Sequence, residues 1–145
     1  MLKSTDDLNI ELITTYDIHN YVADNAAELD NVNFIDFLTA LIDQCGKSKV
    51  ALSDDACISE PFLYNILNAK KKPSRDSVIK LAFGLELDVE TTERLLMLAG
   101  YRNFYVRHKR DALLKHARRN NMDTIEANNL LKQHGFKLVE YKRTP

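Results

Sequence analysis

Apolar side chains recur at helical spacing along most of the chain. They occupy positions i, i+3 and i+4 in the stretches 15–29, 34–42 and 62–67, which is the spacing of one face of an α-helix. Gly46 follows the second stretch and is typical of the residue that ends a helix. The pattern predicts an all-α protein.

The segment 48–74 predicts two short helices joined by a tight turn. The first is expected over residues 49–56, with Val50, Ala51 and Leu52 facing inward. Ser59 is a good N-cap for the second helix, and Pro61 stands in its first turn, where no intrahelical donor is lost. A helix-turn-helix of this layout can place its second helix in the major groove of DNA.

From residue 74 onward the chain repeats itself. Residues 74–101 align with 109–136 at an offset of 35, without a gap, and eight of the 28 positions are identical. Each copy predicts a helix, a turn with an Asp N-cap, a second helix ending in Leu-Leu, and a Gly stop. The cap at Asp123 fits a capping box with Glu126. We expect two stacked helical hairpins that share a core.

An Arg-Asp pair opens each copy of the repeat, as Arg75-Asp76 and Arg110-Asp111. Such a pair suggests either a functional site or a structural contact. The structural interpretation is favoured, because an Asp at a helix start complements the helix dipole. The Arg is then expected to bridge a carboxylate or a carbonyl on the neighbouring hairpin.

Length and composition narrow the class of protein. The chain has 145 residues, 45% of them hydrophobic, which suits one domain, or one domain with an appendage. It contains no apolar run of about 18 residues and no signal peptide at its start, so we expect no membrane span and a cytoplasmic location. Cys45 and Cys57 lack the spacing of metal ligands and are expected to be small buried hydrophobes. No metal and no cofactor is expected.

Charge is segregated along the chain. Residues 1–32 carry one Lys and seven acidic side chains. Two basic clusters follow, in residues 70–75 and 102–119. Basic patches attract phosphate, although solvated helix faces explain the same composition. The acidic segment could also lie on the basic region and mask it.

One set of residues in the centre of the chain carries a family resemblance. The set comprises Leu52-Ser53, Cys57, Ile58-Ser59, Leu63, Ile66, Ala69, Lys70-Lys71 and Pro73-Ser74. Through it, residues 34–99 resemble the phage-repressor-like (Xre-type) helix-turn-helix family, a five-helix domain also called lambda-repressor-like. The resemblance implies fourth and fifth helices over 75–85 and 89–99. It also implies a transcriptional regulator that binds double-stranded DNA, usually as a homodimer.

The resemblance assigns DNA-contacting positions as well. The start of the first helix of the motif is expected to contact phosphate, the exposed face of the second to read base edges, and the following loop to hold the backbone. The expected site residues are Ser48, Lys49, Ser59, Glu60, Pro61, Phe62, Asn65, Asn68, Lys70, Lys71 and Lys72.

This chain departs from the family pattern in two places. Cys57 stands in the turn where Gly is usual, which implies some strain if φ there is positive. Glu60-Pro61-Phe62 replaces the usual polar or basic tip. Glu can accept from cytosine N4 and Phe can touch a thymine methyl, and Asn65 is the best candidate for reading adenine.

The rival function is a protein-interaction module that keeps the scaffold and has lost DNA binding. Phe62 and Tyr64 would then be its anchors and Glu60 its polar contact. An enzyme is not expected, because the sequence has no Gly-rich phosphate loop, no His-Glu-x-x-His and no Cys-x-x-Cys.

The expected organisation has three parts. An acidic helical segment occupies residues 1–32, the helix-turn-helix domain residues 33–101, and a C-terminal helical hairpin with a tail residues 102–145. The first and third parts are the candidate surfaces for a homodimer or a protein partner.

Overall fold

The structure is a computed structural model that describes residues 33–137. This part of the chain contains seven helices and no strand, so the prediction of an all-α protein is confirmed for it. The helices are α3 (Phe34–Cys45), α4 (Lys49–Ala56), α5 (Glu60–Leu67), α6 (Arg75–Gly84), α7 (Val89–Leu98), α8 (Lys109–Arg119) and α9 (Thr124–Gln133). The helix expected within 15–29, and the whole acidic segment, lie outside the described residues.

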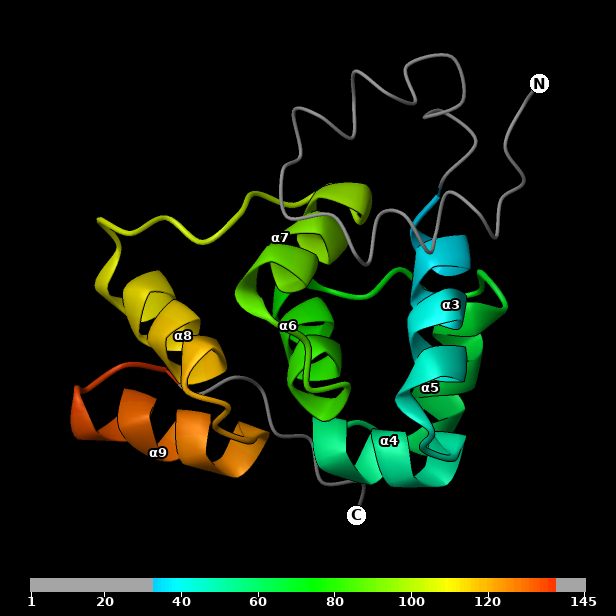
Figure 1. The fold of residues 1–145 in the computed structure, drawn as a ribbon, viewed down its shortest axis with the longest axis horizontal. Coiled ribbons are helices and arrows are strands. Elements are labelled where there is room, and N and C mark those ends of the chain that lie inside the picture. The colour runs from blue at the N-terminus through cyan, green and yellow to red at the C-terminus, as the bar shows by residue number, and fades with distance from the viewer. Residues whose placement is uncertain (1–32, 138–145) are drawn as a thin grey trace.

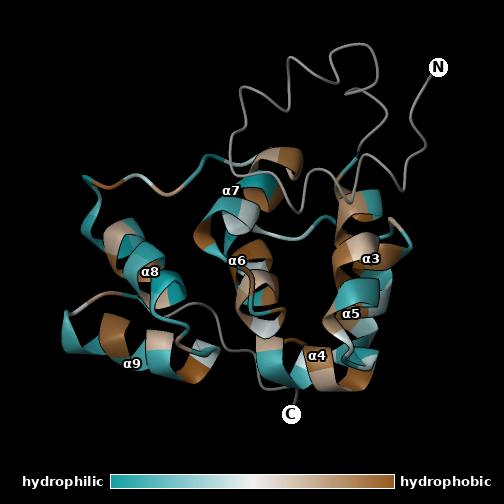
Figure 2. Ribbon diagram, in the orientation of Figure 1, coloured by the Kyte–Doolittle hydropathy of each residue, from teal (hydrophilic) through white to brown (hydrophobic). Residues whose placement is uncertain are grey.

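The helices pack around a central pair, α6 and α7 (Figure 1). α3 and α5 lie on one side of this pair, and α8 and α9 on the other, while α4 runs across one end and packs on α6. One hydrophobic cluster joins all of them, from Phe37 in α3 to Leu131 in α9. Hydrophobic and hydrophilic residues mix along most of the helices (Figure 2), as expected of helices that each bury one face.

The helices begin where the sequence provides a capping side chain. Ser48 accepts a hydrogen bond from the Ala51 N–H at 3.1 Å. Ser59 does the same for the Phe62 N–H at 3.2 Å, so its predicted role as an N-cap is confirmed. The predicted capping box of Asp123 and Glu126 is also present. These bonds satisfy backbone donors that a helix start leaves free.

Most of the helices end in the same way, on a residue in the left-handed conformation. At the end of α4, the Cys57 N–H donates to the Asp54 carbonyl and the Ile58 N–H to the Ser53 carbonyl, at 3.1 and 3.0 Å, the pattern of a Schellman motif. The residues with positive φ are Gly46, Cys57, Ala69, Glu86, Gly100, Asn121 and Gly135. The predicted stop at Gly46 is confirmed, with φ of 74°.

The two copies of the repeat fold alike. α6 and α7 form one hairpin and α8 and α9 the other, and equivalent hydrogen bonds close their turns. The Leu87 N–H donates to the Ala82 carbonyl, and 35 residues later the Met122 N–H donates to the Ala117 carbonyl, both at 3.0 Å. The sequence alignment therefore identified a true structural repeat.

The Arg-Asp pairs join the two hairpins, as the structural interpretation predicted. Arg75 donates to both carboxylate oxygens of Asp111, at 3.0 and 3.1 Å. Arg110 donates to both oxygens of Asp76, at 3.2 and 3.1 Å. Each hairpin thus gives its Arg to the other's Asp. Such reciprocity is the mark of an isologous interface, so the hairpins form a closed pair with an internal pseudo-twofold relation.

Candidate nucleic-acid interface

The candidate interface is built on α4, a three-residue turn and α5. Leu52 and Ala56 of α4 and Leu63 and Ile66 of α5 are all buried, and their spacing of three or four residues fixes which face of each helix meets the core. The expected strain at the turn is present, because Cys57 adopts φ of 58° and ψ of 39°. For a residue with a side chain this conformation costs about 1 to 2 kcal/mol.

Close packing on α6 sets the position of α4. A Cβ atom added at Gly84 would lie 2.8 Å from the Cβ of Ala56, so the absence of a side chain lets the two helices approach. Lys47 also links α4 to α6, because its Nζ donates to the Gly84 carbonyl and to the Asp55 carboxylate, both at 2.7 Å. Burial acts to lower the pKa of Lys47, but the hydrogen bond and charge of Asp55 outweigh it and raise that pKa.

One inward-facing residue was predicted wrongly. Val50 is 51% exposed, whereas Leu52 is fully buried. Val50 and Leu52 are two positions apart, which separates them by about 200° around a helix with 3.6 residues per turn. They therefore cannot both face the core. Contact with α6 near Gly84 selects the face of Leu52 and Ala56 and leaves Val50 outside.

The start of α4 presents Ser48 and Lys49 to solvent. The Ser48 hydroxyl oxygen is already used as the N-cap. The Nζ of Lys49 lies 5.9 Å from the centre of the Tyr64 ring, and Tyr64 is 42% exposed. The cation–π contact links α4 to α5, and at an exposed site it is worth only about 0.5 to 1 kcal/mol, so it does not prevent Lys49 from reaching a phosphate.

The tip of α5 is less open than the sequence suggested. Glu60 is half-buried in the first turn, where the helix dipole favours a negative charge. Phe62 is half-buried and packs against the core, so only part of its ring faces outward. Pro61 is exposed. Asn65 is half-buried, and its side-chain amide makes no hydrogen bond with any described residue, so its donor and acceptor remain available.

The loop after α5 holds its lysines on an ordered backbone. Asn68 is exposed, and Ala69 turns the chain with φ of 60°. The N–H groups of Lys70 and Lys71 both donate to the Asn65 carbonyl, at 2.8 and 3.1 Å. The side chains of these two lysines are exposed, and neither forms an ion pair within residues 33–137.

The third lysine of the loop has a different environment. Lys72 Nζ lies 5.2 Å from the centre of the Tyr101 ring, and the Tyr101 hydroxyl donates to the Pro73 carbonyl at 2.6 Å. The contact stabilises the loop against the end of α7. Lys70 and Lys71 are therefore the stronger candidates for phosphate contact.

Carboxylates near the turn are partly neutralised. Asp55 pairs with Lys47 at 2.7 Å, and Glu86 lies 3.7 Å from the same amine. Asp54 is exposed and forms no ion pair with a described residue. The repulsion that a phosphate would meet beside the turn therefore comes mainly from Asp54 and from Glu60, which also forms no ion pair with a described residue.

Both cysteines are half-buried, not buried as expected. Cys57 lines a cavity that sequence reasoning missed, formed where the α4–α5 turn meets the C-terminal hairpin. The sequence indicates this cavity only weakly. In the alignment of the two repeats Arg118 falls on Phe83, so a cation stands at a position that is apolar in the first copy.

Two findings bound the chemistry of the described residues. In residues 33–137 no three His, Cys, Asp or Glu side chains are grouped so that they could hold a metal ion. The same part of the chain has no helix that is both long and apolar enough to cross a bilayer.

No protein-family model, no curated protein and no solved structure matches this chain.

Proposed function

We propose that this chain is a sequence-specific DNA-binding transcriptional regulator of the phage-repressor-like (Xre) type, with α3 to α7 as its five-helix domain. The observation that carries the proposal is the frame of α4, the turn and α5. It presents Lys49, the unpaired amide of Asn65 and the free lysines 70 and 71 along one continuous segment. Asn65 would read adenine, and the lysines would neutralise phosphates.

The position of the C-terminal hairpin is compatible with this use. α9 meets the far end of α4, where the Thr124 hydroxyl donates to the Asp55 carbonyl at 3.0 Å. The hairpin packs on α6 and α7 and lies away from α5 (Figure 1). The hairpin therefore leaves the outer surface of α5 uncovered.

A homodimer would let the protein bind two half-sites. The two hairpins pack against each other through the reciprocal Arg-Asp pairs. The faces that carry these pairs are therefore not available for dimer contacts. The outer faces of the C-terminal hairpin and the acidic segment 1–32 both remain candidate sources of dimer contacts.

The test is a titration of purified protein against a duplex from its own upstream region and against a scrambled duplex, at about 50 and about 200 mM salt. Tight, salt-sensitive binding to the first duplex is expected. Asn65→Ala should cost about 1 to 3 kcal/mol on that duplex alone, whereas Lys71→Ala should weaken binding to both and reduce the salt slope by about 1.

Lys132→Ala is the matched control, because Lys132 is exposed on α9, far from the proposed interface. It should bind like the parent. Failure to bind either duplex at low salt would refute the proposal, as would equal loss of binding in the Lys71 and Lys132 variants.

A second candidate function is docking of a protein on the same surface. The observation that favours it is the pair of exposed apolar side chains Val50 and Tyr64, since an exposed Tyr is a typical interface anchor. The half-buried Phe62 is a poorer anchor than the sequence suggested. If docking is the function, the parent should bind neither duplex, and Tyr64→Ala should abolish capture of the protein partner.

A further inference from the structure

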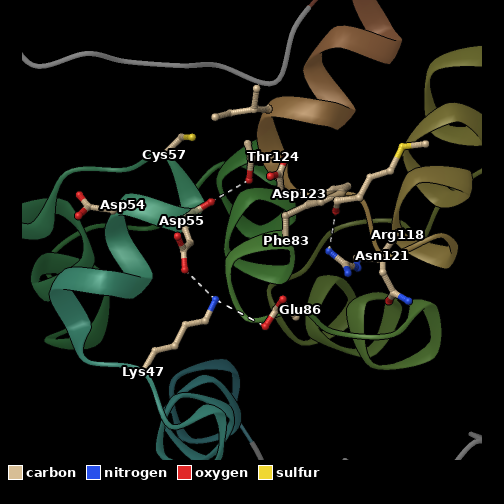
Figure 3. A pocket seen from close by; sticks show the side chains of 12 residues that line it. Lys47, Asp54, Asp55, Cys57, Phe83, Glu86, Arg118, Asn121, Asp123 and Thr124 are labelled. Carbon is tan, nitrogen blue, oxygen red and sulfur yellow. Dashed lines mark hydrogen bonds and ion pairs between the residues drawn. The ribbon is translucent and has the colours of Figure 1, made fainter.

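A cavity of about 260 Å³ lies where three turns meet. It is bounded by the end of α4 with Cys57, by Phe83 at the end of α6 and Glu86 in the turn after it, and by Arg118 and residues 121–125 of the C-terminal hairpin (Figure 3). Its volume is just below the usual range of ligand pockets, about 300 to 1,000 Å³, so it suits only a small molecule.

A buried cation lines this cavity. Arg118 is only 2% exposed, yet its Nε has no hydrogen-bond partner, and it forms no ion pair with a described residue. Its Nη1 donates to the Met122 carbonyl at 3.2 Å, and its guanidinium carbon lies 4.9 Å from the centre of the Phe83 ring. In Figure 3 the group lies between the side chains of Phe83 and Asn121.

This arrangement is costly for the protein alone. Burial lowers the pKa of Arg118, and the charges of Glu86 and Asp88 oppose that shift without making contact. A buried guanidinium normally has a carboxylate or several carbonyls as acceptors. The Nε donor of Arg118 therefore has no acceptor, and Arg118 is among the residues that line the cavity.

Four carboxylates also line the cavity. Besides Arg118 and Lys47 the lining includes the carboxylates of Asp54, Asp55, Glu86 and Asp123. Lys47 is occupied by Asp55 and approaches Glu86. A simple anion on Arg118 would be repelled by Asp123 and Glu86, and a simple cation would leave Arg118 unsatisfied.

We propose that the cavity binds a small zwitterion, such as a free amino acid, whose carboxylate accepts from Arg118 and whose ammonium group faces Asp123 and Glu86. Both charges of such a molecule meet their complement within one small space. The site touches both the α4–α5 turn and the start of α9, so its occupant would join the C-terminal hairpin to the turn. The binding itself does not depend on the proposed DNA-binding function.

The proposal is tested without DNA. The full chain is mixed with each of the twenty proteinogenic L-amino acids at about 10 mM, the thermal midpoint is measured, and any hit is titrated by calorimetry. Acetate and methylamine serve as probes that carry one charge each. At least one amino acid should raise the midpoint and bind saturably, while acetate and methylamine should bind at least tenfold more weakly.

Two variants assign the binding to this cavity. Asp123→Asn should weaken the best amino acid at least tenfold while the helix cap is kept, because Asn caps as well as Asp. Arg118→Met, which keeps the buried volume, should abolish binding; if it does not fold, the Asp123 variant decides alone. Asp43→Asn, the same change on α3 outside the cavity, should bind like the parent. No binding by any amino acid, equal binding of acetate, or unchanged binding by Asp123→Asn would each overturn the proposal.

Discussion

At the scale of single residues, the helix ends of this protein carry conformational strain. Four residues with side chains, Cys57, Ala69, Glu86 and Asn121, adopt the left-handed conformation that favours glycine. Each ends a helix through backbone hydrogen bonds, so the bonds of the Schellman motif compensate for the unfavourable φ. Two of the four, Cys57 and Ala69, flank α5, the proposed recognition helix.

Ala69→Gly should stabilise the protein. Ala69 is exposed with φ of 60°, so Gly removes a strain of about 1 to 2 kcal/mol and loses roughly 0.5 to 1 kcal/mol in chain entropy. The free energy of unfolding, measured by urea denaturation, should rise by about 0.5 to 1 kcal/mol. Ala40→Gly within α3 is the control and should lower it by about 1 kcal/mol. A loss of stability in the Ala69 variant would contradict the assigned conformation.

Cys57 should react slowly with alkylating reagents at neutral pH. Burial raises the pKa of its thiol, the charge of Lys80 acts against this, and Asp123, Asp55 and Asp54 add to the rise. Only the thiolate reacts, so the alkylation rate of Cys57 should reach half its maximum at a higher pH than that of a free thiol. The measurement uses a Cys45→Ser background, with urea-unfolded protein as reference. Equal pH profiles for folded and unfolded protein would refute the shift.

At the scale of elements, the placement of α4 depends on one close approach. Gly84 of α6 meets Ala56 of α4 so tightly that a Cβ would lie 3.0 Å from the Ala56 backbone nitrogen. The contact orients α4 and therefore sets the angle at which the turn and α5 are presented. A buried glycine behind the proposed DNA surface thus controls the geometry of that surface.

Gly84→Ala should destabilise the protein in spite of the better helix propensity of Ala. Overpacking of this kind costs about 1 to 3 kcal/mol, which chemical denaturation would measure. Adding Ala56→Gly should recover part of the loss, because it removes the nearest clashing atom, at 2.8 Å. Additive effects of the two substitutions would show that the two positions do not meet as described.

At the scale of the whole molecule, two equivalent Arg–Asp ion pairs hold the hairpins together, and the two pairs differ in how far they are exposed to solvent. The pair Arg75–Asp111 has side-chain exposures of 17% and 3%, whereas the pair Arg110–Asp76 has 23% and 29%. Burial alone would raise the pKa of Asp111, but hydrogen bonds from Arg75 and from the Tyr105 N–H outweigh it and hold that pKa below its usual value. The more exposed pair, Arg110–Asp76, is therefore a control within the same protein for the effect of burial on the pair Arg75–Asp111.

Asp111→Asn should lower the free energy of unfolding at pH 7 by about 3 kcal/mol, because it leaves a largely buried Arg75 without its carboxylate. Asp76→Asn should cost about 1 kcal/mol or less, as for a more exposed pair. A depressed folded-state pKa contributes stability above the usual aspartate pKa of about 3.9 and loses it as pH falls through the folded-state value. The gap between parent and Asp111→Asn should therefore narrow below about pH 5. Denaturation curves at several pH values test this, and equal costs for the two variants would contradict it.

The sequence predicted the helices well and the partners of individual side chains only in part: it placed each repeated Arg against the neighbouring hairpin but did not say which group accepts from it. The caps at Ser59 and Asp123, the stop at Gly46 and the repeat offset were all readable, because capping and helix spacing act between residues three to five apart. Val50 was predicted on the wrong face, because a helix of eight residues has too few apolar positions to define one.

The sequence by itself therefore determined the all-α class, the bounds of most helices and the duplication of the hairpin, since local hydrogen bonding and periodicity decide them. Only the tertiary structure decided that each repeated Arg bonds the Asp of the other hairpin, and that Arg118 is buried beside a cavity. These features join residues more than 30 positions apart, and their energies depend on burial and on the approach of helices, which no local pattern encodes.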